Sequence, residues 1–304
     1  MKGSGATLKS KKKRDNIFGY LFSLPALFIY GAFTIYPFFY GIYISFCEWS
    51  GFGEPTFIGI QNYLKIPGDG AVFSALAHNA LYAVGTVSVK VVFGFLIALI
   101  LNKSLKGITA FRTILFIPVV ISFIAIGAIW TWILNPTQGL LNNLLIAIGV
   151  MDRGNVTAWL GDERYALISL MIVDLWKWMG YHIVLFLAGL QTISPDLYES
   201  AEIDGVNWYQ KTVYITIPQI KNVFYMNLTF CLVGAFNVFD IVMAMTEGGP
   251  YGATEVISKY IYDTSFGATN MFGYAMSISM FVFVLMLAVT LIILKFMRKA
   301  EENM

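Results

Sequence analysis

The chain has 304 residues, of which 58% are hydrophobic, 16% are aromatic and 12% are charged, and its formal net charge is +2. Soluble domains usually carry about 25% charged residues, so this composition excludes an ordinary soluble domain and predicts a polytopic helical membrane protein. The dense basic run KSKKKR near the N-terminus is expected to anchor the chain at the anionic inner leaflet, rather than to bind nucleic acid.

Six apolar segments each exceed the roughly 20 residues that a helix needs to cross the hydrocarbon core. They lie at 17–46, 76–102, 109–134, 165–193, 222–246 and 272–296. We therefore predict an all-α fold with six transmembrane helices, preceded by a basic tail at 1–16 and forming one membrane domain at 17–304. Pro25 and Pro37 in the first segment, and Pro118 in the third, predict kinks or local unwinding.

Basic residues predict the orientation of these helices, because lysine and arginine concentrate on the cytoplasmic side. With the N-terminus inside, 14 of them fall on the cytoplasmic side and 4 on the outer side. The cytoplasmic set is Lys2, Lys9, Lys11, Lys12, Lys13, Arg14, Lys103, Lys106, Arg112, Lys211, Lys221, Lys295, Arg298 and Lys299, and the outer set is Lys65, Arg153, Arg164 and Lys259. Both termini are thus expected in the cytoplasm, together with a loop at 194–221.

A polar stripe runs along the fourth apolar segment, near its middle. Asp174, Lys177, Trp178 and Tyr181 follow the spacing i, i+3, i+4 and i+7, which places them on one helix face. Ionisable groups at this depth are costly, and they usually serve a function or are paired. In the structural alternative, Asp174 and Lys177 simply neutralise each other within the helix.

A second stripe in the fifth segment lies at a similar depth. Asn237 shares a helix face with Gly234 and with Asp240 or Ile241. Two stripes at one depth predict a polar cavity between helices, where transporter sites often lie. Carboxylates, amides and aromatic rings suit the hydroxyls and the apolar face of a sugar. The alternative role for Asn237 is to hold two helices together.

Lys90 is a buried charge in the second segment. It precedes Asn102 by 12 residues. That is roughly 18 Å along a helix, which is too far for its side chain to reach the inner surface. We expect Lys90 to face the protein interior and to meet Asp174, another carboxylate or a helix C-terminus.

The stretch LYESAEIDGVNWYQKTVYITIP, Leu197 to Pro218, interrupts the apolar pattern. It is predicted to form a helix with Pro195 in its first turn, a turn at Gly205 and a second helix from about Asn207. A helix lying on the inner leaflet is usually basic, whereas this one is acidic. The segment is therefore interpreted as a docking element for a protein with a basic cleft.

Spacing in this loop carries a family resemblance. Glu199-Ser200-Ala201, Gly205 and Ile215–Pro218 resemble the EAA loop of ABC importer permeases, in which Gly follows EAA after three residues and I-x-L-P follows after nine more. The sequence departs from that pattern only by Ser200 in place of alanine and Ile217 in place of leucine. The stretches TAFRTILFIP and GLQTISPDLYESA resemble the carbohydrate group of the same family.

The stretch FDIVMAMTEGGPYGATEVISKYIY also resembles this group, through a motif after the fifth helix. The motif residues are Thr246, Gly248, Gly249 and Pro250. The resemblance covers nearly the whole chain. It implies a type I (MetI-like) permease of the bacterial or archaeal cytoplasmic membrane, of the kind found as the first permease of maltose, multiple-sugar and glycerol-phosphate importers.

The resemblance also implies roles and partners. The coupling positions would be Glu199, Ser200, Ala201, Asp204, Gly205 and Pro218. In this interpretation Glu199 pairs with a basic residue of an ATPase, Ala201 allows close approach and Gly205 makes the turn.

The pathway positions would be Asp174, Trp178, Tyr181, Asn237 and Asp240. The implied partners are a second permease, two ATP-binding subunits, an extracytoplasmic sugar-binding protein, membrane lipid and a sugar, which is expected to be an oligosaccharide.

No enzymatic or metal-binding pattern is found in the sequence. It has no phosphate loop of the G-x-x-x-x-G-K-[ST] type and no HExxH, so ATP and Mg²⁺ are expected on the partner ATPase and no cofactor on this chain. The alternative function is a stand-alone ion-coupled transporter that uses Asp174, Lys177 and Asp240 as a charge relay.

Overall fold

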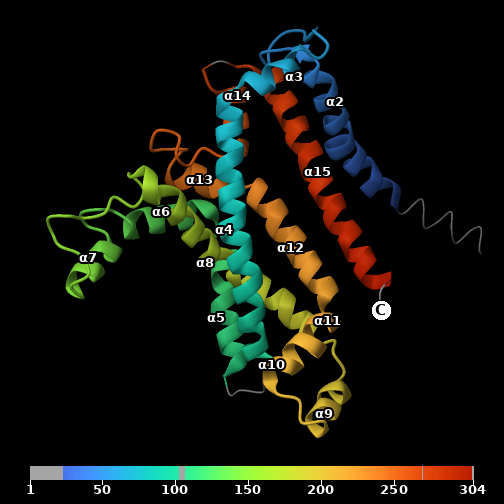
Figure 1. The fold of residues 1–304 in the computed structure, drawn as a ribbon. Coiled ribbons are helices and arrows are strands. Elements are labelled where there is room, and N and C mark those ends of the chain that lie inside the picture. Colours follow the sequence, from blue (N-terminus) through green and yellow to red (C-terminus); the bar gives the residue numbers. More distant parts are fainter. Residues whose placement is uncertain (1–22, 103–106, 269, 303–304) are drawn as a thin grey trace, which may run out of the picture. The chain divides into compact units, whose positions relative to one another are not determined.

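The computed structural model describes residues 23–102, 107–268 and 270–302, and its ribbon is drawn in Figure 1. The basic tail predicted at 1–16, and Lys103 and Lys106, lie outside the described residues. The described chain forms two compact units. The first runs to Ile66 and includes Thr264–Met280, and the second comprises Pro67–Asp263 with the described residues from Phe281 onward.

A helical stretch, Ser23–Ser45, begins the first unit and changes its winding midway. A π-helical turn, η1 (Gly31–Ile35), leads directly into α2 (Tyr36–Ser45), whose first turn contains Pro37. Proline has no N–H to donate and its ring crowds the carbonyl one turn earlier, so a wider turn before it relieves the conflict. The predicted local unwinding at Pro37 is confirmed.

Short elements complete the first unit. They are β1 (Cys47–Glu48), β2 (Thr56–Phe57), which pairs with β1 in antiparallel fashion, α3 (Gln61–Lys65), η2 (Ile66–Gly68), which leads into the second unit, and the start of α15 (Phe272–Glu302). The buried Asn62 amide donates hydrogen bonds to the carbonyls of Ser45 and Cys47, at 3.1 and 2.8 Å. The bond to Ser45 fastens α3 to the end of α2, because it satisfies a carbonyl that the helix itself cannot, and the bond to Cys47 fastens α3 to β1.

Three long helices organise the second unit: α4 (Gly70–Leu101), α8 (Glu163–Leu190) and α12 (Lys221–Phe236). The carboxylates of Asp69 and Asp162 accept hydrogen bonds from the first backbone N–H groups of α4 and α8, and so determine where these helices begin. One apolar core surrounds Tyr82, Leu170 and Ile241. A second core surrounds Phe95 and Phe186, and both connect α4 with α8.

Shorter helices and turns complete the chain. They are α5 (Ile108–Val120), α6 (Phe123–Ile133), α7 (Leu140–Ala147), α9 (Pro195–Ile203), α10 (Trp208–Lys211), η3 (Thr212–Thr216), α11 (Ile217–Gln219), α13 (Asp240–Met245) and α14 (Ile257–Phe266). The all-helical prediction is thus confirmed, apart from the two-residue strands β1 and β2.

Four described helices are long and apolar enough to cross a membrane, and a bent pair raises the number to five. The long helices are Ser23–Ser45, Gly70–Leu101, Glu163–Leu190 and Phe272–Met297, and the pair is α5 with α6, bent by 98°. Six transmembrane helices were predicted, with a kink or local unwinding at Pro118, and two of the predicted segments are not single helices. Segment 109–134 breaks after Pro118, and segment 222–246 divides at Asn237 into α12 and α13.

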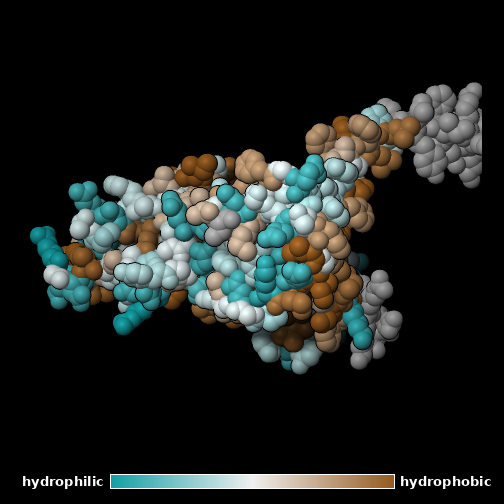
Figure 2. Space-filling model, turned by 90° about the horizontal axis from the view of Figure 1, so that it is seen from above, coloured by the Kyte–Doolittle hydropathy of each residue, from teal (hydrophilic) through white to brown (hydrophobic). Residues whose placement is uncertain are grey.

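Large apolar side chains are exposed along the long helices. Leu81 and Val84 of α4 are 57% and 68% exposed, and Val284 of α15 is 61% exposed. Figure 2, which is seen from above, shows hydrophobic residues interspersed with hydrophilic ones on that face. Soluble proteins rarely expose such extended apolar patches, whereas hydrocarbon accommodates them without cost.

Candidate functional site

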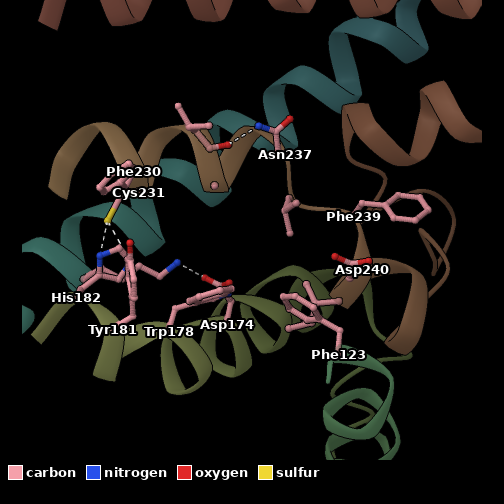
Figure 3. Close-up of a pocket in the computed structure, with 15 residues that line it drawn as sticks. Phe123, Asp174, Trp178, Tyr181, His182, Phe230, Cys231, Asn237, Phe239 and Asp240 are labelled. Carbon is pink, nitrogen blue, oxygen red and sulfur yellow. Dashed lines mark hydrogen bonds and ion pairs between the residues drawn. The ribbon is translucent and has the colours of Figure 1, made fainter. Parts of the chain in front are cut away.

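A cavity of about 510 Å³ lies within the second unit. Its walls come from α4, α6, α8, α12 and α13, and Figure 3 shows their side chains around it. All five residues predicted to form a pathway line it, namely Asp174, Trp178, Tyr181, Asn237 and Asp240. Except for Lys177, the residues of the two predicted stripes therefore face one space.

The charged wall of this cavity is an ion pair between two helices. Lys90 Nζ of α4 lies 2.5 Å from Asp174 Oδ2 of α8, and both side chains are about 6–7% exposed. Lys90 thus faces the interior and meets Asp174, as predicted from its distance to the inner surface.

Sequence reasoning missed a polar cluster beside this pair. His182 Nδ1 lies 2.5 Å from Asn227 Oδ1, and the Cys231 sulfur lies 3.5 Å from the same nitrogen. His182 and Cys231 both line the cavity. Helical spacing contained the necessary signal, because His182 follows Trp178 by four residues and so shares its face. Phe123, Phe230 and Phe239 add aromatic surface that the sequence did not single out.

The end of α12 places the remaining predicted residues on the cavity wall. Asn237 follows the last residue of α12, and its side-chain amide donates to the Val233 carbonyl at 3.0 Å. Among the described residues, none donates a hydrogen bond to the side-chain oxygen of Asn237. Asp240 begins α13, and Figure 3 shows it across the cavity from α12. Asn237 therefore caps its own helix, and the predicted role as a bond between two helices is not observed.

Lys177 is buried as predicted, but it does not line the cavity. Its ammonium group donates to the backbone carbonyls of Pro118, Val119 and Ile121, at 3.3, 3.2 and 2.5 Å. The predicted alternative in which Lys177 neutralises Asp174 is therefore wrong. A lysine side chain has three rotatable donors on a flexible stem, and it reaches acceptors that its backbone position does not reveal.

The acidic loop has the predicted helix–turn–helix form. Pro195 occupies the first turn of α9, and Gly205 follows with φ at +73°. Asn207 then caps α10 through a reciprocal pair of hydrogen bonds with Gln210. No atom lies within 4 Å of a Cβ added at Gly205, so glycine is needed here for its left-handed backbone and not for space.

Individual coupling positions differ in exposure. Glu199, Ser200 and Asp204 are exposed, and Pro218 is exposed in the first turn of α11. Ala201 is only 4% exposed and packs within the chain itself. The expectation that Ala201 gives a partner close access is thus corrected, because its small side chain is already covered by the loop.

One face of the loop is hollowed and acidic. Glu199 and Glu202 line a depression of about 360 Å³, together with Tyr198 and Asn102 at the end of α4. Glu202 accepts a hydrogen bond from Lys211 at 2.7 Å, and this bond lowers the pKa of the Glu202 carboxyl. Glu199 forms no ion pair among the described residues, so its charge is available to a partner.

The motif after α13 forms a tight loop. Thr246 and Thr254 share a hydrogen bond of 2.7 Å between their hydroxyl groups, and Thr254 also donates to the Gly249 carbonyl at 2.6 Å. Gly248 has φ at +90°, and a Cβ added there would collide with the Glu255 carboxylate. Glycine at this position is therefore required for its left-handed conformation, and the contact that an added Cβ would make is with the flexible end of the Glu255 side chain; Gly249 and Pro250 follow.

Comparison with known proteins agrees with this architecture. Residues 90–300 match the family described as binding-protein-dependent transport system inner membrane component. The chain is 38% identical to the probable ABC transporter permease protein YurN of Bacillus subtilis (strain 168), over 95% of this chain and 99% of that protein. It is 34% identical to the trehalose/maltose transport system permease protein MalF of Thermococcus litoralis, over 95% and 96% of the two chains.

A solved structure shares the fold. It is the crystal structure of a bacterial ABC transporter involved in the import of the acidic polysaccharide alginate, with a TM-score of 0.81 and 25% identity over 96% of this chain and 99% of that chain. The family match covers more than half of the sequence, and the resemblance seen in the acidic loop is confirmed. This chain belongs to the binding-protein-dependent transport system inner membrane components, the multi-pass permeases of ABC transporters, and is not their catalytic subunit.

Proposed function

We propose that this chain is one of two permeases in an ATP-driven sugar importer, and that it provides half of the translocation pathway for an oligosaccharide. The observation that carries the proposal is the convergence of Asp174, Trp178, Tyr181, Asn237 and Asp240 on one cavity. Polar groups there match sugar hydroxyls, and the aromatic rings match the apolar face of a pyranose. Related permeases that are named for lactose and for trehalose/maltose transport support the sugar class.

The proposal includes six membrane crossings with both termini in the cytoplasm. Charge asymmetry supports this orientation. The fifth crossing would then combine α12, whose 16 residues span only roughly 24 Å, with the chain around α13. A broken helix of this kind is suitable at a transport site, because irregular backbone is tolerated where it lines a cavity.

The acidic loop is proposed to couple the permease to its ATPase. Glu199 has no described ionic partner and lines the hollow between α9 and the end of α4, which suits a basic side chain. Two ATP-binding subunits would hold ATP and Mg²⁺, and a sugar-binding protein would deliver substrate outside. The loop containing Thr246, Gly248, Gly249 and Pro250 is a candidate for that outer contact.

The ion-coupled alternative is less consistent with the geometry. It needs Asp174, Lys177 and Asp240 in one relay, yet Lys177 is directed to the carbonyls between α5 and α6. Asp174 is already paired with Lys90. No observation on the described residues favours this second function.

Coupling is tested by charge reversal on α9. The complete transporter is co-expressed, purified and reconstituted, and ATPase recovery and ATP-driven sugar uptake are measured. Glu199→Lys should lose both, whereas Asp196→Lys should retain both, because Asp196 is exposed on the same helix but does not line the hollow. Full assembly and uptake in Glu199→Lys would refute the coupling role.

The cavity is tested in the same preparation by removing one aromatic ring. Trp178→Ala should assemble but transport poorly. Trp176→Ala is the matched control, because Trp176 is on the same helix turn, is 41% exposed and does not line the cavity. Equal uptake kinetics in the two variants would remove the cavity from the pathway.

A further inference from the structure

The break between α5 and α6 leaves backbone carbonyl groups that need donors. The last four carbonyls of any helix have no partner within it, and hydrocarbon offers no water to replace one. Here α5 ends at Val120, Ile121 is extended, and Ser122 starts α6 by accepting a hydrogen bond from the Ala125 N–H. The chain turns by 98° at this point.

Lys177 of α8 supplies those donors. Its ammonium group donates to three carbonyls, those of Pro118 and Val119 in the last turn of α5 and that of Ile121 within the break. The Pro118 carbonyl also accepts a hydrogen bond from the Ile121 N–H at 3.3 Å. The C-terminal end of a helix carries partial negative charge, so an ammonium group is favoured there. The side chain is 2% exposed, and none of the ion pairs among the described residues includes it.

The same ammonium group contacts two rings of the cavity wall. Lys177 Nζ lies 4.6 Å from the ring centre of Phe123 and 5.3 Å from that of Trp178. The two rings are themselves 6.3 Å apart, and both line the cavity. One cation therefore contacts the helix break on one side and the aromatic wall on the other.

A second contact holds the same two helices together. At Gly180, one turn after Lys177, an added Cβ would collide with the Leu115 carbonyl and approach the Phe116 Cα at 3.1 Å. The α8 backbone thus lies directly against α5. The break is consequently held from two neighbouring turns of α8, by close backbone packing at Gly180 and by hydrogen bonds at Lys177.

We propose that Lys177 is a positioning residue, which clamps the break between α5 and α6 and thereby holds Phe123 in the cavity wall. The geometric part of this proposal is independent of what is transported. Its consequence for uptake rests on the proposed function. Lys177 acts through Phe123 and does not itself contact the substrate.

The geometry is tested by a distance between spin labels on α6 and α8. Ile124 and Ile172 are 81% and 52% exposed and are replaced by labelled cysteines, with the buried Cys47 and Cys231 replaced by serine. Lys177→Met should shift or broaden the distance distribution in nanodiscs, and Lys177→Arg should preserve it. Lys259→Met, which removes another buried lysine far along the chain on α14, should leave it unchanged.

Uptake is measured in the reconstituted transporter with the native cysteines. Lys177→Met should raise the KM for sugar about tenfold, as expected for one mispositioned contact, and Lys177→Arg should restore it. Phe123→Ala should raise KM without changing the label distance, which separates loss of the ring from loss of the clamp. If the wild type shows no ATP-driven uptake, the proposed function is wrong. The distance measurement still shows whether Lys177 holds the break between α5 and α6.

A second variant, Lys177→Gln, keeps the test decisive if Lys177→Met does not fold. Lys177→Gln has a shorter side chain with only two N–H bonds and no charge, so it should shift the label distance in the same direction but by less. An unchanged distance in Lys177→Met, or in Lys177→Gln where the methionine variant does not assemble, would overturn the proposal.

Discussion

Lys90 of α4 and Asp174 of α8 meet across 2.5 Å in the wall of the cavity, and each is almost completely buried. Removing two charges from water is expensive, and their mutual attraction compensates for it only while both are present. The pair is therefore a strong link between two long helices, and at the same time a polar surface that faces the cavity.

Breaking this pair should destabilise the protein more than removing it altogether. Lys90→Met or Asp174→Asn alone should cost about 3–5 kcal/mol, because each leaves one uncompensated buried charge. The double variant should cost clearly less than the sum. Thermal unfolding of the purified protein in detergent, arranged as a double-mutant cycle, measures the coupling.

The matched control for this cycle is the pair Lys259 and Asp263, one turn apart on α14. Asp263 is 47% exposed, so its charge remains largely solvated without a partner. Coupling there should be smaller than for Lys90 and Asp174, because only Lys259 of this pair is buried. If the effects of Lys90→Met and Asp174→Asn were simply additive, the ion pair would not link α4 to α8.

Gly180 should be intolerant of any side chain. Gly180→Ala forces a methyl group against the Leu115 carbonyl, which belongs to backbone and cannot move aside. Overpacking of this kind costs about 1–3 kcal/mol or more. Gly94→Ala is the control, because the nearest atoms there lie at 3.5 Å or beyond, in ordinary contact. Thermal unfolding should show that Gly180→Ala is less stable than Gly94→Ala. Equal stability of the two variants would show that the α5 backbone moves to make room for the methyl group.

Features determined by nearby residues were predictable from the sequence. Pro195, Gly205 and Asn207 each act through their own backbone or the next turn, so the shape of the acidic loop followed from them. The polar stripe on α8 was equally accessible, because helical spacing alone determines a face. The depth of Lys90 limited its expected partners to Asp174, another carboxylate or a helix C-terminus, and Asp174 is the one that it meets.

Features determined by distant residues were not predictable. The run 222–246 is mostly apolar, and its polar residues Asn237 and Asp240 fit one continuous helix face, so its pattern does not show that α12 ends before Asn237. Pro118 indicated a bend but not its 98° angle, which depends on how α8 packs against α5. The partner of Lys177 was missed for the same reason, since its acceptors are carbonyl groups that exist only once α5 has ended.

The turn at Gly205 should be sensitive to backbone conformation only. Gly205→Ala places a Cβ in a left-handed conformation and should cost about 1–2 kcal/mol, whereas Gly205→Asn should cost less, because asparagine tolerates that region. Hydrogen exchange of the loop amides measures the effect. Gly154→Ala is the control, because that glycine also has open space around it but lacks a positive φ. Equal exchange in the alanine and asparagine variants would contradict this account.

The Glu255 carboxyl should make the loop after α13 pH-dependent. Burial raises its pKa above the ordinary value of 4.5, and the nearby Lys259 only partly opposes this. A carboxyl whose folded-state pKa is raised binds its proton more tightly in the folded loop. Its stabilising contribution is therefore complete below pH 4.5 and is lost as the pH rises through the raised value. Protonation also suits its position, because its oxygen lies against Gly248 and its side chain is only partly exposed.

Glu255→Gln keeps the shape of the side chain and removes its titration. The variant should protect the amides of residues 246–256 from hydrogen exchange more strongly than the wild type at neutral pH, with the difference vanishing at acid pH. Asp152→Asn, at an exposed carboxyl in another loop, should leave these amides unchanged at both pH values. A difference between Glu255→Gln and the wild type that grew toward acid pH would reverse the sign of the linkage and refute burial as the dominant influence on Glu255.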